Sequence, residues 1–268
     1  MSGNPFSKLK QSVLAVQLIQ FGGRQTSDFA ATLKLCKEAG IQHVEVNYCK
    51  LPKVIPEFLA HCRASNVSVH AGHVRFEEIS TNSRLSLVLS TMNELSCPML
   101  ICSGMATGTA DVRWRRTARW FKGIFARCRE QNVEFLYHPY KGCVSLHQGR
   151  CQLDDILDET ADEKMNIVLD SFWCNSVVWF DSDRQLRLLE RCRYFHLKDG
   201  FHRPKPPSRM FVPLGEGEIS LDMWLSLIRK SATLHRQVSV VIEQDTYATD
   251  PFSELVRSMQ YLLKKGLP

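Results

Sequence analysis

Four residues with side chains that bind divalent metals stand at matching places in the sequence, each where a short apolar run meets polar residues. They are His138, Asp170, His196 and Glu243. Imidazoles and carboxylates together suit Mn, Fe, Co or Zn, and suit Mg less well because Mg prefers oxygen ligands alone. One such residue usually only forms hydrogen bonds or caps a loop. Four at matching positions predict a metal site, since buried unpaired carboxylates would be costly without a cation.

Other polar residues near the same run ends are candidates for contact with a substrate. Glu45 lies inside an apolar run and could point inward. His70 and His73 flank an Ala-Gly turn, and either could touch a ligand or have only a structural role. Lys198 follows closely after His196 and could hold a substrate oxygen or a phosphate.

The residues after Lys198 add two weaker candidates. Asp199 could orient a ligand from behind it. Glu216 lies between two glycines in the segment Pro213–Ile219, where a glycine-rich backbone could approach a ligand closely.

Eight short apolar runs precede or contain these residues and alternate with longer amphipathic segments. Their starts are 24 to 44 residues apart, which is about one β-α-β step each time. They are rich in β-branched residues, as parallel strands covered on both faces are. The predicted strands are Val13–Phe21, His43–Tyr48, Val67–His70, Pro98–Cys102, Val133–Tyr137, Asn166–Leu169, Tyr194–Leu197 and Val238–Ile242.

Helical patterns fill the gaps between the runs. The clearest predicted helices are Ser27–Ala39, Arg113–Arg129, Asp181–Cys192 and a last one that Asp250 caps, with Pro251 in its first turn. Eight strand and helix pairs over 268 residues favour a single closed (β/α)8 TIM barrel, with residues 1–268 as one domain. An open doubly wound sheet is the alternative, but Gly22 and Gly23 lack its GxGxxG spacing.

The barrel prediction also gives meaning to the positions of the polar residues. Function in such barrels lies at the carboxyl ends of the strands, so all four candidate ligands belong to one mouth. The proline-rich segment His202–Pro213 is too short for a domain and is predicted to be a rim loop or lid.

Composition excludes several classes of protein. Hydrophobic residues make up 44% and charged residues 23%, which argues against disorder, collagen and coiled coils. No apolar run reaches the ~20 residues of a membrane helix, and the N-terminal segment lacks a signal peptide's apolar stretch. We therefore expect a cytoplasmic protein without membrane contact.

The cysteines and the charge add weaker expectations. The ten cysteines form no CxxC pair, and Cys36, Cys62, Cys128 and Cys192 are predicted to be buried thiols. The net charge of +6 mildly favours anionic ligands. The arginines of residues 113–119, next to Trp114 and Trp120, could form a solvated helix face or bind a phosphate or partner.

Taken in order and spacing, several segments resemble the sugar-phosphate isomerase/epimerase superfamily, the xylose-isomerase-like barrels, over nearly the whole chain. The most specific are Phe195–Gly200, Pro213–Ile219 and Val241–Asp245. Val168–Asp170 followed by Trp173 is similar to the family's strand-6 motif, and Leu136–His138 to the start of a strand-5 motif in one subgroup.

The resemblance implies one divalent metal and a small sugar, sugar phosphate or polyol as substrate. The implied reaction is isomerisation or epimerisation through an enediolate, or a related dehydration. Asp170, His196 and Glu243 match the family's metal-ligand positions, and Glu243 also inherits the role of base. Lys198 and His138 are further catalytic candidates, and Trp173 joins Glu45, His70, Lys198 and Glu216 as candidate substrate contacts.

Strand 5 departs from the family pattern. Family members commonly have a glutamate there that often serves as the second acid/base, whereas this chain reads His138-Pro139-Tyr140. Ligation by His138 is therefore inferred from its strand position. Two alternatives stay open, an endonuclease IV-like nuclease and a ligand-binding barrel without turnover. Nucleic acid is not the expected partner, and the oligomeric state, a homodimer included, is left open.

Overall fold

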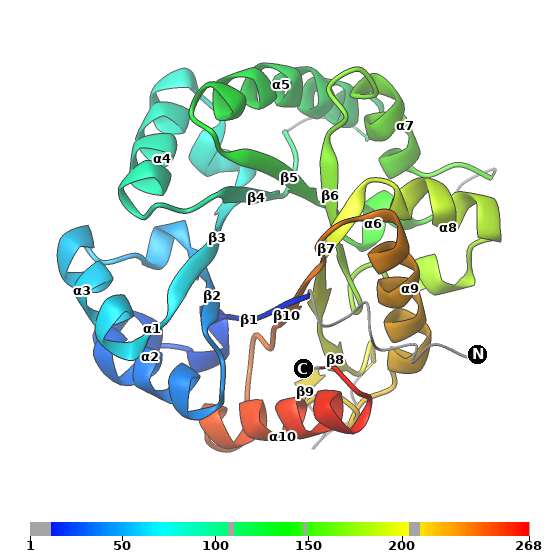
Figure 1. Ribbon diagram of the computed structural model, residues 1–268. Helices are drawn as coiled ribbons and strands as arrows, with labels where there is room; N and C mark the ends of the chain where they lie inside the picture. The colour runs from blue at the N-terminus through cyan, green and yellow to red at the C-terminus, as the bar shows by residue number, and fades with distance from the viewer. Residues whose placement is uncertain (1–11, 107–109, 147–148, 204–209, 268) are drawn as a thin grey trace.

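Eight parallel strands close into a barrel, which Figure 1 shows along its axis with the helices as an outer ring. The computed structural model describes residues 12–106, 110–146, 149–203 and 210–267. The barrel strands are β1 (Val13–Gln17), β2 (His43–Asn47), β3 (Ser68–Arg75), β4 (Met99–Ser103), β5 (Glu134–His138), β6 (Asn166–Asp170), β7 (Cys192–Leu197) and β10 (Ser239–Ile242). β10 pairs with β1 and closes the ring. The predicted (β/α)8 barrel is confirmed, and the open sheet was the wrong alternative.

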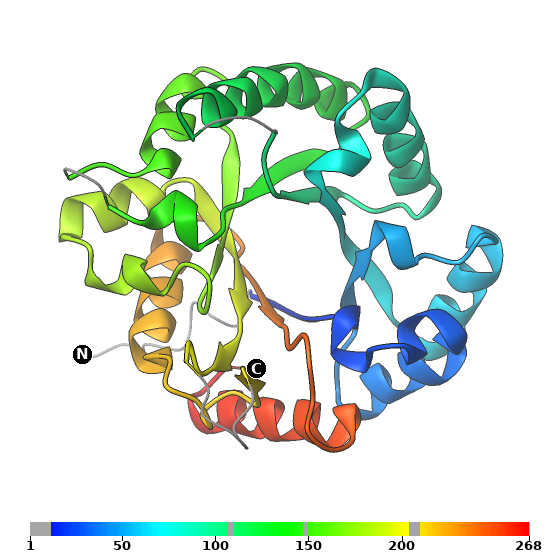
Figure 2. The same ribbon diagram turned by 180° about the vertical axis from the view of Figure 1, so that it is seen from behind.

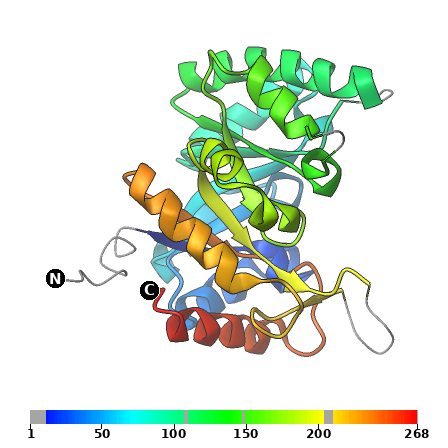
Figure 3. The ribbon, with the colours of Figure 1, turned by 90° about the vertical axis from the view of Figure 1, so that its right-hand side faces the viewer.

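The helices cover the outside of the strands, as the view from behind in Figure 2 also shows. They are α1 (Arg24–Ser27), α2 (Phe29–Glu38), α3 (Ile55–Ser65), α4 (Asn82–Glu94), α5 (Ala110–Glu130), α6 (Lys141–Val144), α7 (Gln152–Glu159), α8 (Ser182–Leu189), α9 (Leu221–Leu234) and α10 (Pro251–Lys264). α9 and α10 lie side by side (Figure 3), where Lys265 pairs with Asp222 at 2.5 Å. Asp250 caps α10, as predicted, by accepting a hydrogen bond from the Ser253 N–H.

Strand and helix ends differ from the prediction for local reasons. β1 stops at Gln17 rather than Phe21, because the Gln17 side chain accepts the Ile19 N–H at 2.6 Å and starts a 3₁₀ turn. β3 is longer than predicted and reaches Arg75. α8 ends at Leu189, so Cys192 begins a strand instead of ending a helix.

Side chains inside the barrel form layers, because alternate residues of a strand point to the same side. Below the mouth, an apolar and buried layer, two side chains deep at β4, fills the lumen: Ala15, Ala71, Met99, Ile101, Leu136, Val168, Tyr194 and Val241. Two residues farther along four of these strands come the predicted ligands His138, Asp170, His196 and Glu243. The apolar layer therefore closes the lumen beneath a polar layer at the carboxyl ends of the strands.

The thiols and the helices agree with the expectations from composition. All ten cysteines are free, and only Cys49 among them is exposed. Burial raises the pKa of the Cys36 thiol to about 12, so it stays protonated. None of the helices in the described ranges is long and apolar enough to cross a membrane.

Candidate metal centre

The four predicted ligands converge at the mouth of the barrel. One ligand atom from each of His138, Asp170, His196 and Glu243 lies within 4.8 Å of the others, and all four residues are buried. The His138 Nε2 is 3.7 Å from the Asp170 Oδ2, and the His196 Nδ1 is 2.7 Å from the Glu243 Oε2.

Three of these ligand atoms are buried and form no hydrogen bond of good geometry, although the last two of them lie 2.7 Å apart as an ion pair. They are the Asp170 Oδ2, the His196 Nδ1 and the Glu243 Oε2. The other Asp170 oxygen, in contrast, accepts the Phe172 and Trp173 N–H groups at 2.8 Å each, which fixes the carboxylate. Buried polar atoms are almost always partnered, so the Asp170 Oδ2 without a hydrogen bond, together with three other ligand atoms within 4.8 Å, fits a bound cation.

Glu45 lies directly behind His196 and holds it in place. Its carboxylate accepts hydrogen bonds from the Tyr194 hydroxyl at 2.7 Å, from the His196 Nε2 at 2.8 Å and from the His73 Nδ1 at 2.9 Å. A carboxylate on the far nitrogen fixes the ring and leaves the Nδ1 for a metal. Glu45 is fully buried and orients His196 and His73. The sequence predicted a contact with the substrate instead.

Opposite charges decide the protonation of the cluster. Burial alone would lower the pKa of His196, but the Glu45 and Glu243 carboxylates raise it to about 10. Burial would raise the pKa of Glu243 and of Asp170, yet the Lys198 ammonium and the neighbouring imidazoles together lower both. The carboxylates are therefore ionised, and a metal on the His196 Nδ1 would take the place of a proton.

Lys198 is buried among three carboxylates and stays charged. Its Nζ is 3.0 Å from the Glu243 Oε1, 3.1 Å from the nearer Asp245 oxygen and 3.7 Å from the Asp170 Oδ2. Burial would lower its pKa, but Glu243, Asp170 and Asp245 raise it overall. Lys198 can therefore stabilise a negative oxygen but cannot act as a base near neutral pH.

The cluster opens into a cleft with two lobes. The first lobe, of about 310 Å³, is lined by His73, Ser103, His138, Tyr140, Lys141, Trp173, Lys198, Glu243 and Asp245. The second lobe, of about 370 Å³, is lined by Gln17, Ile19, Gln25, Asn47, Cys49, Lys50, His73, Val74, Arg75, Glu78, Ser103 and Glu243. His73, Ser103 and Glu243 line both lobes, so the lobes meet at the candidate metal centre.

The remaining predicted contacts separate into two groups. Trp173 lines the first lobe, with its ring centroid 5.8 Å from the Lys198 Nζ. His70 lies on the other side of Tyr194, where it contacts the Ser239 hydroxyl at 2.8 Å near the start of β10. Glu216 is exposed and forms an ion pair with Arg257 at 2.9 Å. The structure thus brings neither His70 nor Glu216 into the cleft.

Sequence reasoning assigned no role to several residues that line the cleft. Ser103 ends β4 and pairs in register with His138, so its position follows from the strand spacing. Asp245 follows Glu243 by two residues, and the alternation of side chains along a strand could have indicated that Asp245 lines the cleft. Burial and the Glu243 charge raise the pKa of Asp245 to about 6, although Lys198 opposes them. Tyr140 and Lys141 follow a strand without any pattern that marks them.

Asp199 shapes the rim of the barrel rather than the metal centre. Its two carboxylate oxygens accept the N–H groups of Gly200, Gly215, Gly217 and Ile219 at 2.7 to 3.2 Å. Asp199 and Gly200 also form β8, which pairs with β9 (Phe211–Val212). The last residues of the predicted rim loop His202–Pro213 thus lie in this hairpin. Residues 204–209 of the loop lie outside the described residues.

Gly217→Ala is expected to destabilise the protein by about 1–3 kcal/mol. An added Cβ would lie 2.2 Å from the Asp199 Oδ1 and 2.5 Å from the Gly200 nitrogen, so the rim would have to shift. Urea unfolding measures the loss. Gly123→Ala in α5 is the control, because its Cβ meets nothing and should stabilise the helix by about 0.5–1 kcal/mol. Equal effects at the two positions would contradict this account of the rim.

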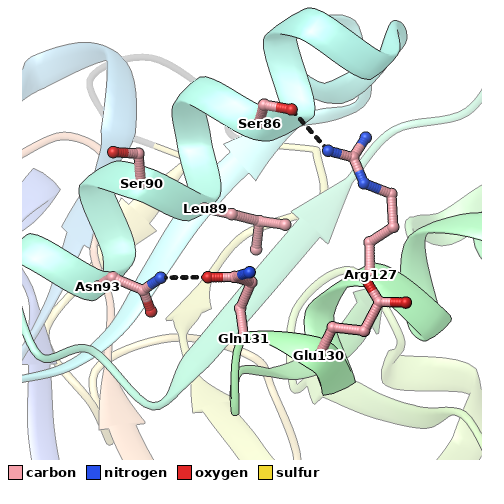
Figure 4. Close-up of a pocket in the computed structure, with 7 residues that line it drawn as sticks. All are labelled: Ser86, Leu89, Ser90, Asn93, Arg127, Glu130 and Gln131. Atoms are coloured by element: carbon pink, nitrogen blue, oxygen red, sulfur yellow. Dashed lines mark hydrogen bonds between the residues drawn. The ribbon is translucent and has the colours of Figure 1, made fainter.

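Two other surface features belong to the outer wall. Figure 4 shows a polar pocket between α4 and α5 in which Arg127 bonds to Ser86 at 2.5 Å and Asn93 to Gln131 at 2.7 Å. These hydrogen bonds join the two helices and occupy the side-chain groups that form them. Near the start of α5, Trp114 and Trp120 pack against the hydrophobic core, whereas Arg115, Arg116 and Arg119 are exposed on a solvated helix face. Arg113 is half-buried, with a buried Nε.

A family model described as xylose isomerase-like TIM barrel matches residues 33–265, which is most of the chain. The chain belongs to this family. No curated protein matches the sequence. The relatives among solved structures share the fold at low identity, so they say nothing by themselves about the reaction.

Three solved structures illustrate the likeness. A sugar phosphate isomerase/epimerase from Parabacteroides distasonis is 16% identical with a TM-score of 0.73, over 94% of this chain and 98% of that one. The IOLI protein with a bound zinc atom is 15% identical with a TM-score of 0.70, over 95% and 98%. An L-ribulose 3-epimerase is 14% identical with a TM-score of 0.71, over 96% and 94%.

Proposed function

We propose that this protein is a metal-dependent enzyme that isomerises, epimerises or dehydrates a small sugar, sugar phosphate or polyol through an enediolate. The observation that carries the proposal is the buried cluster of His138, Asp170, His196 and Glu243 at the base of a cleft, in which one ligand atom of each residue lies within 4.8 Å of the others. Two family members of similar fold, a sugar phosphate isomerase/epimerase and a sugar epimerase, support the reaction class. A third holds zinc.

The chain supplies four ligands to one divalent ion. They are the His138 Nε2, the Asp170 Oδ2, the His196 Nδ1 and the Glu243 Oε2. A divalent ion held by these residues would supply polarisation of the carbonyl and the adjacent hydroxyl of the substrate. Two imidazoles and two carboxylates suit Zn, Mn, Co or Fe better than Mg.

Glu243 is the proposed base of the reaction. One of its oxygens belongs to the ligand set, and the other lies 3.0 Å from the Lys198 Nζ; the residue lines both lobes. Glu243 can take a proton from one carbon and return it to the next, while the Lys198 ammonium stabilises the oxygen of the enediolate.

The proposed proton transfer uses one face of the substrate. A metal-bound His138 cannot serve as a base, and Glu216 is turned toward α10. Asp245 leaves the same strand end as Glu243, so a base at Asp245 would act from the same side of the cleft. Without a carboxylate on the strand-5 side, isomerisation or dehydration is favoured over epimerisation, which needs a base on each face of the carbon.

A panel of sugars and sugar phosphates in deuterated water tests the proposal. We expect at least one member to be turned over by the metal-loaded protein, and we expect turnover to stop after chelation and to return with added metal. A protein that binds metal and sugar but converts no member would be a binding barrel. Salt-sensitive binding of abasic DNA would favour the nuclease instead.

A further inference from the structure

The second lobe of the cleft contains two cations that lack a carboxylate partner. Lys50 ends the 3₁₀ turn Tyr48–Lys50 after β2, and Arg75 ends β3. Neither side chain forms an ion pair with any carboxylate in the part of the chain that the structure describes. Glu78 also lines this lobe, but one of its oxygens accepts the Arg75 N–H at 2.8 Å and caps the next turn.

Two amide side chains of the second lobe bond to each other. The Gln17 Nε2 donates to the Asn47 Oδ1 at 3.0 Å, and the Asn47 Nδ2 donates back to the Gln17 Oε1 at 3.3 Å. These amides are therefore fixed in place. Lys50 and Arg75 are the lysine and the arginine of this lobe, and both can engage an anionic ligand.

The first lobe has a different character. Trp173 and Tyr140 give it aromatic surface, which suits the carbon face of a sugar. Its Lys198 is already paired with Glu243 and Asp245, which leaves it less available to an anionic group of a ligand. Lys141 is the cation of this lobe without an ion pair among the described residues.

We infer that the second lobe binds an anionic group of the substrate, a phosphate or a carboxylate, through Lys50 and Arg75. This inference rests on the proposed function, because it places the reacting carbons at the metal centre where the lobes meet. Arginine can hold either anion with two parallel hydrogen bonds, and lysine adds a point charge. The excess positive charge of the chain would also draw anionic substrates to the cleft.

Calorimetric titration of the metal-loaded protein tests the inference with three related probes. They are neutral xylitol, xylitol 5-phosphate and xylonate. We expect at least one anion to bind ~10-fold or more tightly than xylitol, because a charged hydrogen bond is typically worth that much. Preference for the phosphate would indicate a sugar phosphate substrate, and preference for the carboxylate a sugar acid.

Four variants assign the effect to residues. Lys50→Gln and Arg75→Gln should each weaken binding of the preferred anion by ~10-fold and leave xylitol within about twofold. Lys53→Gln removes a charge from an exposed neighbour and should change neither affinity. Lys141→Gln tests the first lobe and should have a smaller effect on the anion than either variant of the second lobe.

Three results would overturn the inference. One is equal affinity of the wild type for all three probes. Another is an anion preference that survives in the double variant Lys50→Gln/Arg75→Gln, which would assign the anion to the metal. The third is a loss confined to Lys141→Gln. In all three cases metal-dependent xylitol binding would leave the proposed function intact, whereas absence of metal uptake would overturn both.

Discussion

Replacing Glu243 with glutamine is expected to reduce turnover of the substrate by at least ~10²–10⁴-fold, the usual contribution of a general base. Glutamine keeps the size of the side chain but cannot accept a proton from carbon. It would also remove one of the carboxylates around Lys198, and weaker metal binding would add to the loss. The measurement is kcat at saturating metal, with bound metal determined for each sample.

Glu216→Gln is the matched control, because Glu216 is an exposed carboxylate paired with Arg257 outside the cleft. Its turnover should stay within about twofold of the wild type. In deuterated water the wild type should return deuterium to the face from which the proton was removed. Delivery with inversion would require a second base, and His73, which lines both lobes, is in place to supply one.

The second large effect concerns metal and stability. Saturating the wild type with its metal, at about a thousand times the dissociation constant, should add about 4 kcal/mol to the free energy of unfolding. For a chain of this size that corresponds to a rise in Tm of about 10 °C. Calorimetry with and without chelator measures the rise, and the metal content of the dialysed protein measures binding directly.

Variants of the metal centre should reduce metal binding and the rise in Tm to different extents. Asp170→Asn removes a ligand charge and should abolish metal uptake and the rise in Tm. Glu45→Gln should weaken metal binding by ~10–100-fold, since Glu45 orients His196 without binding the ion. Asp28→Asn is the control, because asparagine also caps a helix and Asp28 only caps α2. An unchanged rise in Asp170→Asn would contradict the proposed ligand set.

The convergence of the four ligands could be predicted because it depends on two regular features of the fold. Parallel strands in a barrel end at the same face, and alternate residues of each strand point into the lumen. Both rules apply to Asp170 and His196, which are paired directly in register between β6 and β7. A sequence that gives strand ends correctly to within a residue or two therefore also gives the residues of the centre.

What could not be predicted depends on departures from these periods. Between β2 and β3 the register shifts after Val44, which pairs with Val69 while Glu45 pairs with Ala71. The shift leaves His70 at the base of the lumen and carries His73 into the cleft, a choice that the sequence left open. Glu216 turned outward because the four N–H groups held by Asp199 fix its loop, and no local pattern announces such a contact.

The layering of the lumen has a consequence for how this protein could be redesigned. Packing of the barrel depends on the apolar layer, whereas each chemical group at the mouth stands two residues beyond it on its own strand. Each of the four ligand positions could thus be substituted without a change in the apolar layer beneath it. His138→Glu alone would place a carboxylate at the end of β5, so a chemistry with two bases lies one substitution away from the proposed one.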